Sequence, residues 1–277
     1  MKIALTGATG FVGRQILRAL IRKNISVCAL VRDPTRLEPI ALGYDNLEVV
    51  HVEDIFFEEP SRLAKNLAGV DTLIHAAWYV DPSDYLNSMK NIDCLNGTID
   101  LARAFSQARG RRFVGIGTCA EYAPSSELIT EDTPLEPSNL YAACKASAFQ
   151  VLNELSKLQQ FSFSWCRLFY LYGDGEKSGR LVPYLRNRLG NGLEVELSSG
   201  NQVRDWLEIG AAADMIVETA LSDRQGAFNV CSGIGVSVRD FATRIADEYG
   251  RADLLRFGRR PENPFDPPYV VARRVEL

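Results

Sequence analysis

Short apolar runs alternate with longer segments of helical spacing along this chain. Six such runs precede residue 170 and lie at residues 2–6, 27–31, 47–52, 72–76, 113–116 and 163–168. A segment long enough for a crossover helix follows each run, as in residues 15–22, whose apolar side chains share one helical face. Strands covered by helices on both faces read as continuous apolar runs. The pattern therefore predicts an α/β fold with a doubly wound parallel sheet.

The rhythm changes after Leu168. A turn-rich segment at residues 172–175 precedes a predicted helix over 181–189, which Gly-Asn-Gly at 190–192 ends. Farther on, residues 228–230 are predicted as a strand that returns to the sheet, and 236–249 as an amphipathic helix.

These features predict two interwoven regions. We expect a first domain over residues 1–168, with a returning segment near 205–231. A smaller C-terminal region over 169–277 is expected to be interwoven with it.

Composition narrows the class of protein. Of the 277 residues, 46% are apolar and 24% charged, which is typical of a soluble globular protein, and the net charge of −4 argues against a nucleic-acid partner. No apolar run reaches the roughly twenty residues of a membrane span, so we expect a cytoplasmic protein without a membrane partner. Scattered cysteines without CxxC pairs argue against disulfides and a metal site; they lie at 28, 94, 119, 144, 166 and 231.

A glycine-rich turn joins the first strand to the first helix. The glycines have GxxGxxG spacing: Gly7 and Gly10 allow a tight turn and close backbone approach, and Gly13 is expected to let the helix pack against the sheet. An ordinary turn is the alternative, but this position is where a pyrophosphate rests on helix N-terminal amides. The sequence therefore predicts a dinucleotide site whose candidate residues are Gly7, Thr9, Gly10, Phe11, Val12 and Gly13.

Arg32 follows the second strand, where a reader of the adenosine ribose is expected. A guanidinium here can pair with a 2′-phosphate, which favours NADP(H) over NAD(H). Two alternatives stay open: Asp33 could bond a ribose hydroxyl, or Arg32 could be a solvated loop charge. Asp54 and Ile55, after the third strand, are candidates to flank the adenine.

Tyr141 and Lys145 open a predicted helix and lie four residues apart, so their side chains share a face. A free tyrosine has a pKa near 10, and a neighbouring cation such as Lys145 lowers it. This spacing alone is weak evidence. Thr118 follows the fifth strand, at the sheet edge where ligands bind, and is the natural hydroxyl partner.

Together these motifs resemble the extended short-chain dehydrogenase/reductases, which include nucleotide-sugar epimerases, dehydratases and reductases. The resemblance covers nearly the whole chain and also involves His75-Ala76-Ala77, Tyr122 and the segments 167–173 and 200–205. It implies a Rossmann sheet, an NAD(P) cofactor that contacts Ala76 and Ala77, and a catalytic triad of Thr118, Tyr141 and Lys145. In that triad Tyr141 is the acid/base, Lys145 also binds the nicotinamide ribose, and Thr118 bonds the reacting oxygen.

The resemblance also implies a nucleotide sugar as the small-molecule partner. Arg204 resembles the arginine that meets the nucleotide phosphates, and Arg180 and Pro183 belong to the region that lines the nucleotide, with a surface salt bridge as the alternative for either arginine. A homodimer is an open possibility. Cys94 departs from the pattern because the family has asparagine there, and Asn96 lies two positions away on another side of the helix.

The type of reaction follows from a second departure. The dehydratases of this family place Asp-Glu directly after the catalytic threonine, where this chain has Cys119 and Ala120. Glu121 is one position late, and alternation along an extended segment would turn it away. With Arg32 and the reductase-like segments 117–122 and 202–206, we expect NADPH-dependent reduction of the 4-keto group of a nucleotide-activated 6-deoxy sugar. The alternatives are an NAD-dependent 4-epimerase and a non-catalytic dinucleotide sensor.

Overall fold

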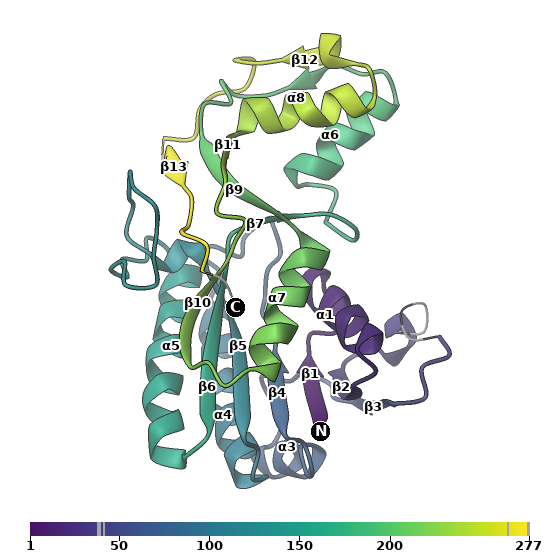
Figure 1. Ribbon diagram of the computed structural model, residues 1–277, viewed down its shortest axis with the longest axis vertical. Helices are drawn as coiled ribbons and strands as arrows, with labels where there is room; N and C mark the ends of the chain where they lie inside the picture. The colour runs from purple at the N-terminus through teal and green to yellow at the C-terminus, as the bar shows by residue number, and fades with distance from the viewer. Residues whose placement is uncertain (38–39, 41, 265, 276–277) are drawn as a thin grey trace.

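The computed structural model describes residues 1–37, 40, 42–264 and 266–275. Its centre is a seven-stranded parallel sheet in the order β10-β6-β5-β4-β1-β2-β3 (Figure 1). The strands are β1 (Lys2–Thr6), β2 (Ser26–Val31), β3 (Leu47–His51), β4 (Thr72–His75), β5 (Arg112–Thr118), β6 (Ser162–Leu168) and β10 (Gly226–Val230). The predicted doubly wound sheet and the returning last strand are confirmed.

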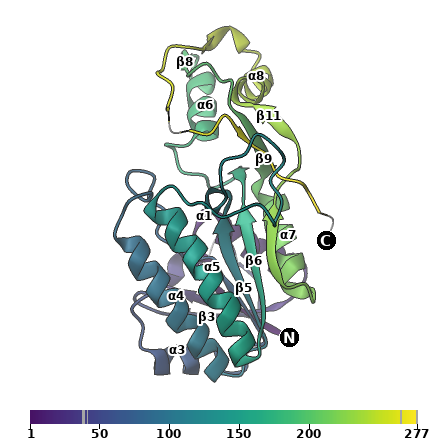
Figure 2. The ribbon, with the colours of Figure 1, turned by 90° about the vertical axis from the view of Figure 1, so that its left-hand side faces the viewer.

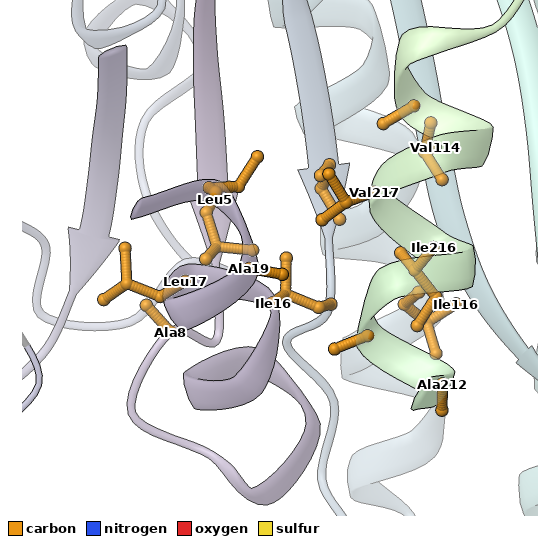
Figure 3. Packing of buried hydrophobic residues seen from close by; sticks show 14 of the residues in the cluster. Leu5, Ala8, Ile16, Leu17, Ala19, Val114, Ile116, Ala212, Ile216 and Val217 are labelled. Carbon is orange, nitrogen blue, oxygen red and sulfur yellow. The ribbon is translucent and has the colours of Figure 1, made fainter. Parts of the chain in front are cut away.

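Helices cover both faces of this sheet. One face carries α1 (Phe11–Arg22) and α7 (Ile209–Leu221), and the other carries α3 (Pro60–Asn66), α4 (Lys90–Gln107) and α5 (Leu140–Gln159) (Figure 2). Figure 3 shows Ile16 of α1 and Ile216 of α7 beside Ile116 of β5 in the first layer. Each buried aliphatic side chain of this kind contributes roughly 1.5–3 kcal/mol.

A smaller lobe stands at the carboxyl edge of the sheet (Figures 1 and 2). It contains β7 (Tyr170–Tyr172), β9 (Val203–Glu208), β11 (Gly235–Ser237) and β13 (Tyr269–Val270) in one sheet, and β8 (Val195–Glu196) and β12 (Leu255–Arg256) in another. Its helices are α6 (Leu181–Gly190) and α8 (Val238–Glu248). The Trp206 ring stacks on the Phe241 ring at 4.1 Å and so joins β9 to α8. Short 3₁₀ turns complete the chain: η1 (Pro34–Leu37), η2 (Cys119–Glu121) and η3 (Ala252–Leu254).

Two helices differ from their predicted limits. The helix predicted from residue 15 begins at Phe11, directly after Gly10. The helix predicted over 236–249 begins only at Val238, because Ser237 caps it by accepting a hydrogen bond from Asp240 N at 2.9 Å, and the residues before it form β11. The division into domains at residue 168 stays a prediction.

None of the helices in the described part of the chain has the length and apolar character to cross a membrane.

Candidate active site

The glycine loop lies against the end of β4. Gly7 has a φ of +71°, and a Cβ there would lie 2.7 Å from the Ala77 nitrogen, so only glycine fits. Gly10 N donates to Gly7 O at 2.9 Å, and Gly10 caps α1 without a side chain. Because the first amides of a helix have no intrahelical acceptor, the start of α1 is suited to bind a pyrophosphate.

Gly13 lets α1 come close to the glycine loop. A Cβ at Gly13 would lie 2.0 Å from Gly7 O, and Gly7 directly follows β1, so a side chain at Gly13 would hold the helix away from the end of that strand. Ile16 and Leu17 pack in the hydrophobic cluster between α1 and the sheet. The structure brings the loop's candidate residues together at one helix terminus, with Thr9, Phe11 and Val12 only partly buried.

Arg32 is exposed at the end of β2, which fits both a residue that meets a ligand and a solvated loop charge. One oxygen of the Asp33 carboxylate, Oδ1, accepts from Thr35 N at 3.2 Å and from Thr35 Oγ1 at 2.6 Å. Arg36, which the sequence analysis did not single out, donates from Nη2 to Thr9 O at 3.5 Å. The 3₁₀ turn η1 places Arg36 near the glycine loop, and no local pattern predicted that turn.

Asp54 and Ile55 lie just beyond β3, but they differ in exposure. Asp54 is half-buried, and its Oδ1 accepts from Phe56 N at 3.0 Å. Ile55 is buried in the hydrophobic cluster under α3 and α4. Its side chain therefore packs mainly against the protein.

A chain of hydrogen bonds ties β1 to β4 beneath the glycine loop. Thr6 Oγ1 lies 2.7 Å from His75 Nδ1, and His75 Nε2 lies 2.9 Å from Thr98 Oγ1. Thr6 Oγ1 also accepts from Ala77 N at 3.3 Å. Burial lowers the pKa of His75 to about 3, so the ring is neutral. These bonds hold Ala76 and Ala77 beside Gly7.

Thr118, Tyr141 and Lys145 all lie at the carboxyl end of β5. Thr118 ends β5, and its hydroxyl lies close enough to the Tyr141 phenol to lower the pKa of that phenol, although burial outweighs this effect. Lys145 Nζ donates to the carbonyl of Ile116 in β5 at 2.6 Å. Tyr141 and Lys145 lie in the first two turns of α5, which begins at its cap, Asn139, whose Oδ1 accepts from Ala142 N at 3.0 Å.

The pKa values of Tyr141 and Lys145 differ from the expectation that Lys145 lowers the pKa of Tyr141. Burial raises the pKa of the Tyr141 phenol above its usual value, and the effect of Thr118 only partly offsets this. The expected lowering by Lys145 does not appear. Burial lowers the pKa of Lys145 itself to about 7, and its Nζ donates to Ile116 O at 2.6 Å. Tyr141 is therefore a protonated phenol at neutral pH and suited to donate a proton.

Two aromatic rings cover the triad, and the sequence analysis missed both. Trp78, which directly follows Ala77, has its ring centre 3.7 Å from Lys145 Nζ. Tyr85 packs edge-on against Tyr141, with ring centres 5.0 Å apart. For Trp78 the sequence did offer a signal, because a bulky aromatic residue stands there directly after the cofactor motif His75-Ala76-Ala77.

Glu121 takes a position that the sequence analysis did not predict. The expected extended segment is the 3₁₀ turn η2, and the Glu121 side chain is fully buried. Its carboxylate accepts hydrogen bonds from Thr118 N, Trp165 Nε1 and Arg167 Nε, so it is not free to act as an acid on a substrate.

Arg204 is buried, so the surface salt bridge considered for it is wrong. Its Nη2 lies 2.7 Å from Asp266 Oδ1, and its guanidinium carbon lies 5.0 Å from the centre of the Tyr170 ring. Arg180 caps α6 and is exposed, with Nε 4.0 Å from Glu176 Oε1. Pro183 is half-buried in the first turn of α6. Nucleotide binding by these residues stays a prediction.

Helix α4 carries Cys94 at the position where the family pattern has asparagine. Cys94 is buried, and its Sγ accepts from Tyr79 N at 3.3 Å. Asn96 is exposed and so faces away from the triad, as expected.

Sequence comparisons agree with this geometry. The model of the NAD dependent epimerase/dehydratase family matches residues 3–231. The dTDP-6-deoxy-L-talose 4-dehydrogenase (NAD(+)) of Aggregatibacter actinomycetemcomitans is 24% identical, over 96% of this chain and 97% of the relative. The CDP-abequose synthase of Salmonella typhimurium is 24% identical, over 99% of this chain and 90% of the relative. The expectation of an NAD(P)-dependent enzyme is confirmed.

Solved structures share the fold. A UDP-N-acetylglucosamine 4-epimerase from Methanobrevibacter ruminantium superposes with a TM-score of 0.88 at 21% identity, covering 98% of this chain and 88% of that one. A dTDP-glucose 4,6-dehydratase from Streptomyces venezuelae with NAD bound gives a TM-score of 0.86 at 22% identity and the same coverage. Both likenesses confirm the Rossmann fold expected from the sequence.

Proposed function

The chain belongs to the NAD dependent epimerase/dehydratase family, and we propose that it catalyses the NADPH-dependent reduction of the 4-keto group of a nucleotide-activated 6-deoxy sugar. The observation that carries this proposal is the placement of Thr118, at the end of β5, beside a buried and protonated Tyr141, with Lys145 on the next turn of α5. The two curated relatives described above are named for dTDP-linked and CDP-linked sugars, which supports a nucleotide sugar as the substrate class.

The residues perform the proton half of the reduction. Bound NADPH would supply a hydride to C4. The keto oxygen gains negative charge as that bond forms, and the Tyr141 hydroxyl donates its proton to this oxygen, which gives a C4 hydroxyl. Thr118 bonds the same oxygen and holds it in line with the phenol. The phenolate that remains on Tyr141 regains a proton from solvent. Lys145 is proposed to bind the nicotinamide ribose.

The residues that follow Thr118 support reduction over dehydration. Elimination of water from the sugar needs one side chain that donates a proton and one that removes a proton, but Cys119 and Ala120 stand directly after Thr118. Burial raises the pKa of the Cys119 thiol to about 12, so that residue is a poor proton donor at neutral pH. Glu121 is fully buried and held by three donor groups.

The ribose end of the cofactor site supports NADPH. A carboxylate that selects NADH accepts from the ribose hydroxyls, and Asp33 Oδ1 is less suited to this because it already accepts two hydrogen bonds from Thr35. Arg32 is exposed beside it, and Arg36 reaches the carbonyl of Thr9 in the glycine loop. Two guanidinium groups on one side of the loop suit a 2′-phosphate.

The smaller lobe is proposed to hold the nucleotide part of the substrate. Arg204 is a buried cation whose partner, Asp266, is partly exposed at 35%, so a diphosphate can replace that carboxylate. Arg180 and Pro183 at the start of α6 are proposed to line the nucleotide. In this proposal residues 1–168 bind the cofactor and 169–277 cover the sugar nucleotide.

The test is an NADPH-consumption assay with 4-keto-6-deoxy sugar nucleotides. We expect one NADPH oxidised for each product formed, and no change in a saturated 4-hydroxy sugar nucleotide incubated without added cofactor. Interconversion of two 4-hydroxy epimers without added cofactor would replace the proposal with a 4-epimerase. Cofactor binding without turnover across a panel of sugar nucleotides would instead indicate a sensor.

A further inference from the structure

Glu121 is a fully buried carboxylate directly behind the triad, and the mechanism above gives it no role. Its Oε1 accepts from Thr118 N at 2.8 Å and from Trp165 Nε1 at 3.0 Å, and its Oε2 accepts from Arg167 Nε at 2.7 Å. Three donor groups in a dry interior specify one position for the carboxylate. Since one of them is the main-chain N–H of Thr118, Glu121 also specifies where that residue's hydroxyl lies.

The surrounding backbone is shaped to admit this carboxylate. A Cβ at Gly117 would lie 2.5 Å from Glu121 Oε1 and 2.2 Å from Trp165 Nε1. A Cβ at Gly115 would lie 2.3 Å from the Trp165 ring. Two glycines in the central strand β5 weaken a strand by lost side-chain packing, and here they leave the room that the Glu121–Trp165 contact needs.

Arg167 balances the charge of Glu121 and joins it to the last strand of the sheet. Its Nη1 donates to Tyr122 OH at 2.9 Å, and Tyr122 OH donates to Asn229 Oδ1 at 2.7 Å. Burial raises the pKa of Tyr122 to about 12, so this residue stays neutral. The part of the network from Glu121 through Arg167 to Tyr122 therefore contains one negative and one positive group.

The charged and titratable groups that act on Lys145 come from three elements. Glu121 in η2 and Cys94 in α4 favour its ammonium form, whereas burial opposes it. Burial raises the pKa of the Cys94 thiol to about 11, so that thiol is neutral at neutral pH, and His75 in β4 is neutral as well. Glu121 is therefore the group among these that carries a negative charge. The Trp165 ring relates it to Lys145, because Trp165 Nε1 donates to Glu121 Oε1 at 3.0 Å and the ring centre lies 5.7 Å from Lys145 Nζ.

We propose that Glu121 is a positioning residue of the active site, which orients Thr118 through its main-chain N–H and keeps Lys145 in its ammonium form. The proposal rests on the proposed function in one respect, because it takes Thr118 and Lys145 as members of the catalytic triad. Glu121 touches neither cofactor nor substrate in this arrangement; it acts through the two residues that do.

The effect of the Glu121 charge on Lys145 is tested by nuclear magnetic resonance on protein labelled with ¹³C at lysine Cε, without substrate. The Lys145 signal is assigned by its loss in Lys145→Arg. Its titration midpoint, expected near the value of about 7 given by burial, should move to lower pH by about one pH unit in Glu121→Gln. Glu127→Gln removes the same charge from an exposed position on the following loop and should leave the midpoint unchanged. An unchanged midpoint in Glu121→Gln, or an equal shift in Glu127→Gln, overturns the proposal.

Orientation of Thr118 is tested with Glu121→Asp, which keeps the charge and also serves if Glu121→Gln does not fold. The shorter side chain cannot hold Thr118 N and Arg167 Nε together, so kcat should fall about tenfold or more while the KM for NADPH and the Lys145 midpoint stay near wild type. Wild-type kcat in this variant overturns the positioning role. The resonance measurement needs no substrate, so failure of the NADPH-consumption assay is a separate result.

Discussion

Asn91 Oδ1 accepts a hydrogen bond from Trp78 Nε1 at 2.9 Å, so one buried amide fixes the ring that covers the Lys145 ammonium. The Nδ2 of the same amide donates to the carbonyls of Tyr85 and Ser88 at 2.6 and 2.9 Å. Tyr85 in turn packs on Tyr141. Both aromatic covers of the triad therefore depend on Asn91.

Asn91→Ala should lower the free energy of unfolding by about 1–3 kcal/mol, because it removes the hydrogen bonds of the Asn91 amide with Trp78 Nε1 and with the carbonyls of Tyr85 and Ser88. Denaturant unfolding measures this loss. Asn96→Ala removes the same side chain from an exposed position of the same helix and should change stability by less than about 0.5 kcal/mol. Equal losses in the two variants would show that the amide contacts contribute nothing.

Tyr141→Phe should lower kcat by about a hundredfold or more, because the ring stays in place while the proton donor is lost. Initial rates of NADPH oxidation measure the effect, and cofactor titration should show unchanged NADPH binding. Tyr85→Phe removes a hydroxyl from the ring packed against Tyr141 and should cost only a few-fold. Near wild-type turnover in Tyr141→Phe would assign the proton donor to another residue.

Arg32→Ala and Arg36→Ala should each weaken NADPH binding about tenfold or more and leave NADH binding nearly unchanged, since only NADPH offers a 2′-phosphate for a charge-assisted hydrogen bond. Dissociation constants for both cofactors, measured by fluorescence titration, check this. Arg103→Ala, on the exposed face of α4, is the matched control. Equal weakening of both cofactors, or a wild-type preference for NADH, would contradict the proposed 2′-phosphate site.

The buried His75 makes stability depend on pH. Its pKa is lowered from about 6.5 in the unfolded chain to about 3 in the folded one, so between these values only the unfolded chain takes up the proton. The free energy of unfolding should therefore fall as pH drops below 6.5, and His75 should account for roughly 1.4 kcal/mol of this fall for each pH unit. Above pH 6.5 the stability contribution of the neutral His75 should be complete.

Denaturant unfolding between pH 4 and 7.5 measures that slope. His75→Gln keeps a hydrogen-bonding side chain between Thr6 and Thr98. It should reduce the slope of unfolding free energy against pH by the amount that the uptake of one proton causes. His51→Gln changes the chain's other histidine, which is exposed, and should keep the wild-type slope. A slope in His75→Gln equal to that of wild type would show that the folded protein protonates His75 without cost.

The alternation of apolar runs and helical segments was enough to predict the doubly wound sheet, because strand and helix periods are local properties of the chain. The glycine loop and the placement of Thr118, Tyr141 and Lys145 were predictable for the same reason. The loop needs a backbone that only glycine allows at Gly7, and the triad residues stand at the end of one strand and the start of one helix.

Tertiary structure alone decided what surrounds those residues. Glu121 was expected to turn away along an extended segment, yet it is buried against Trp165 and Arg167, which lie 44 and 46 positions farther along the chain. Arg204 was weighed as a surface charge, yet Asp266 and Tyr170 enclose it. Partners this distant leave no local period in the sequence, because the free energy of a buried charge depends on which groups the fold brings around it.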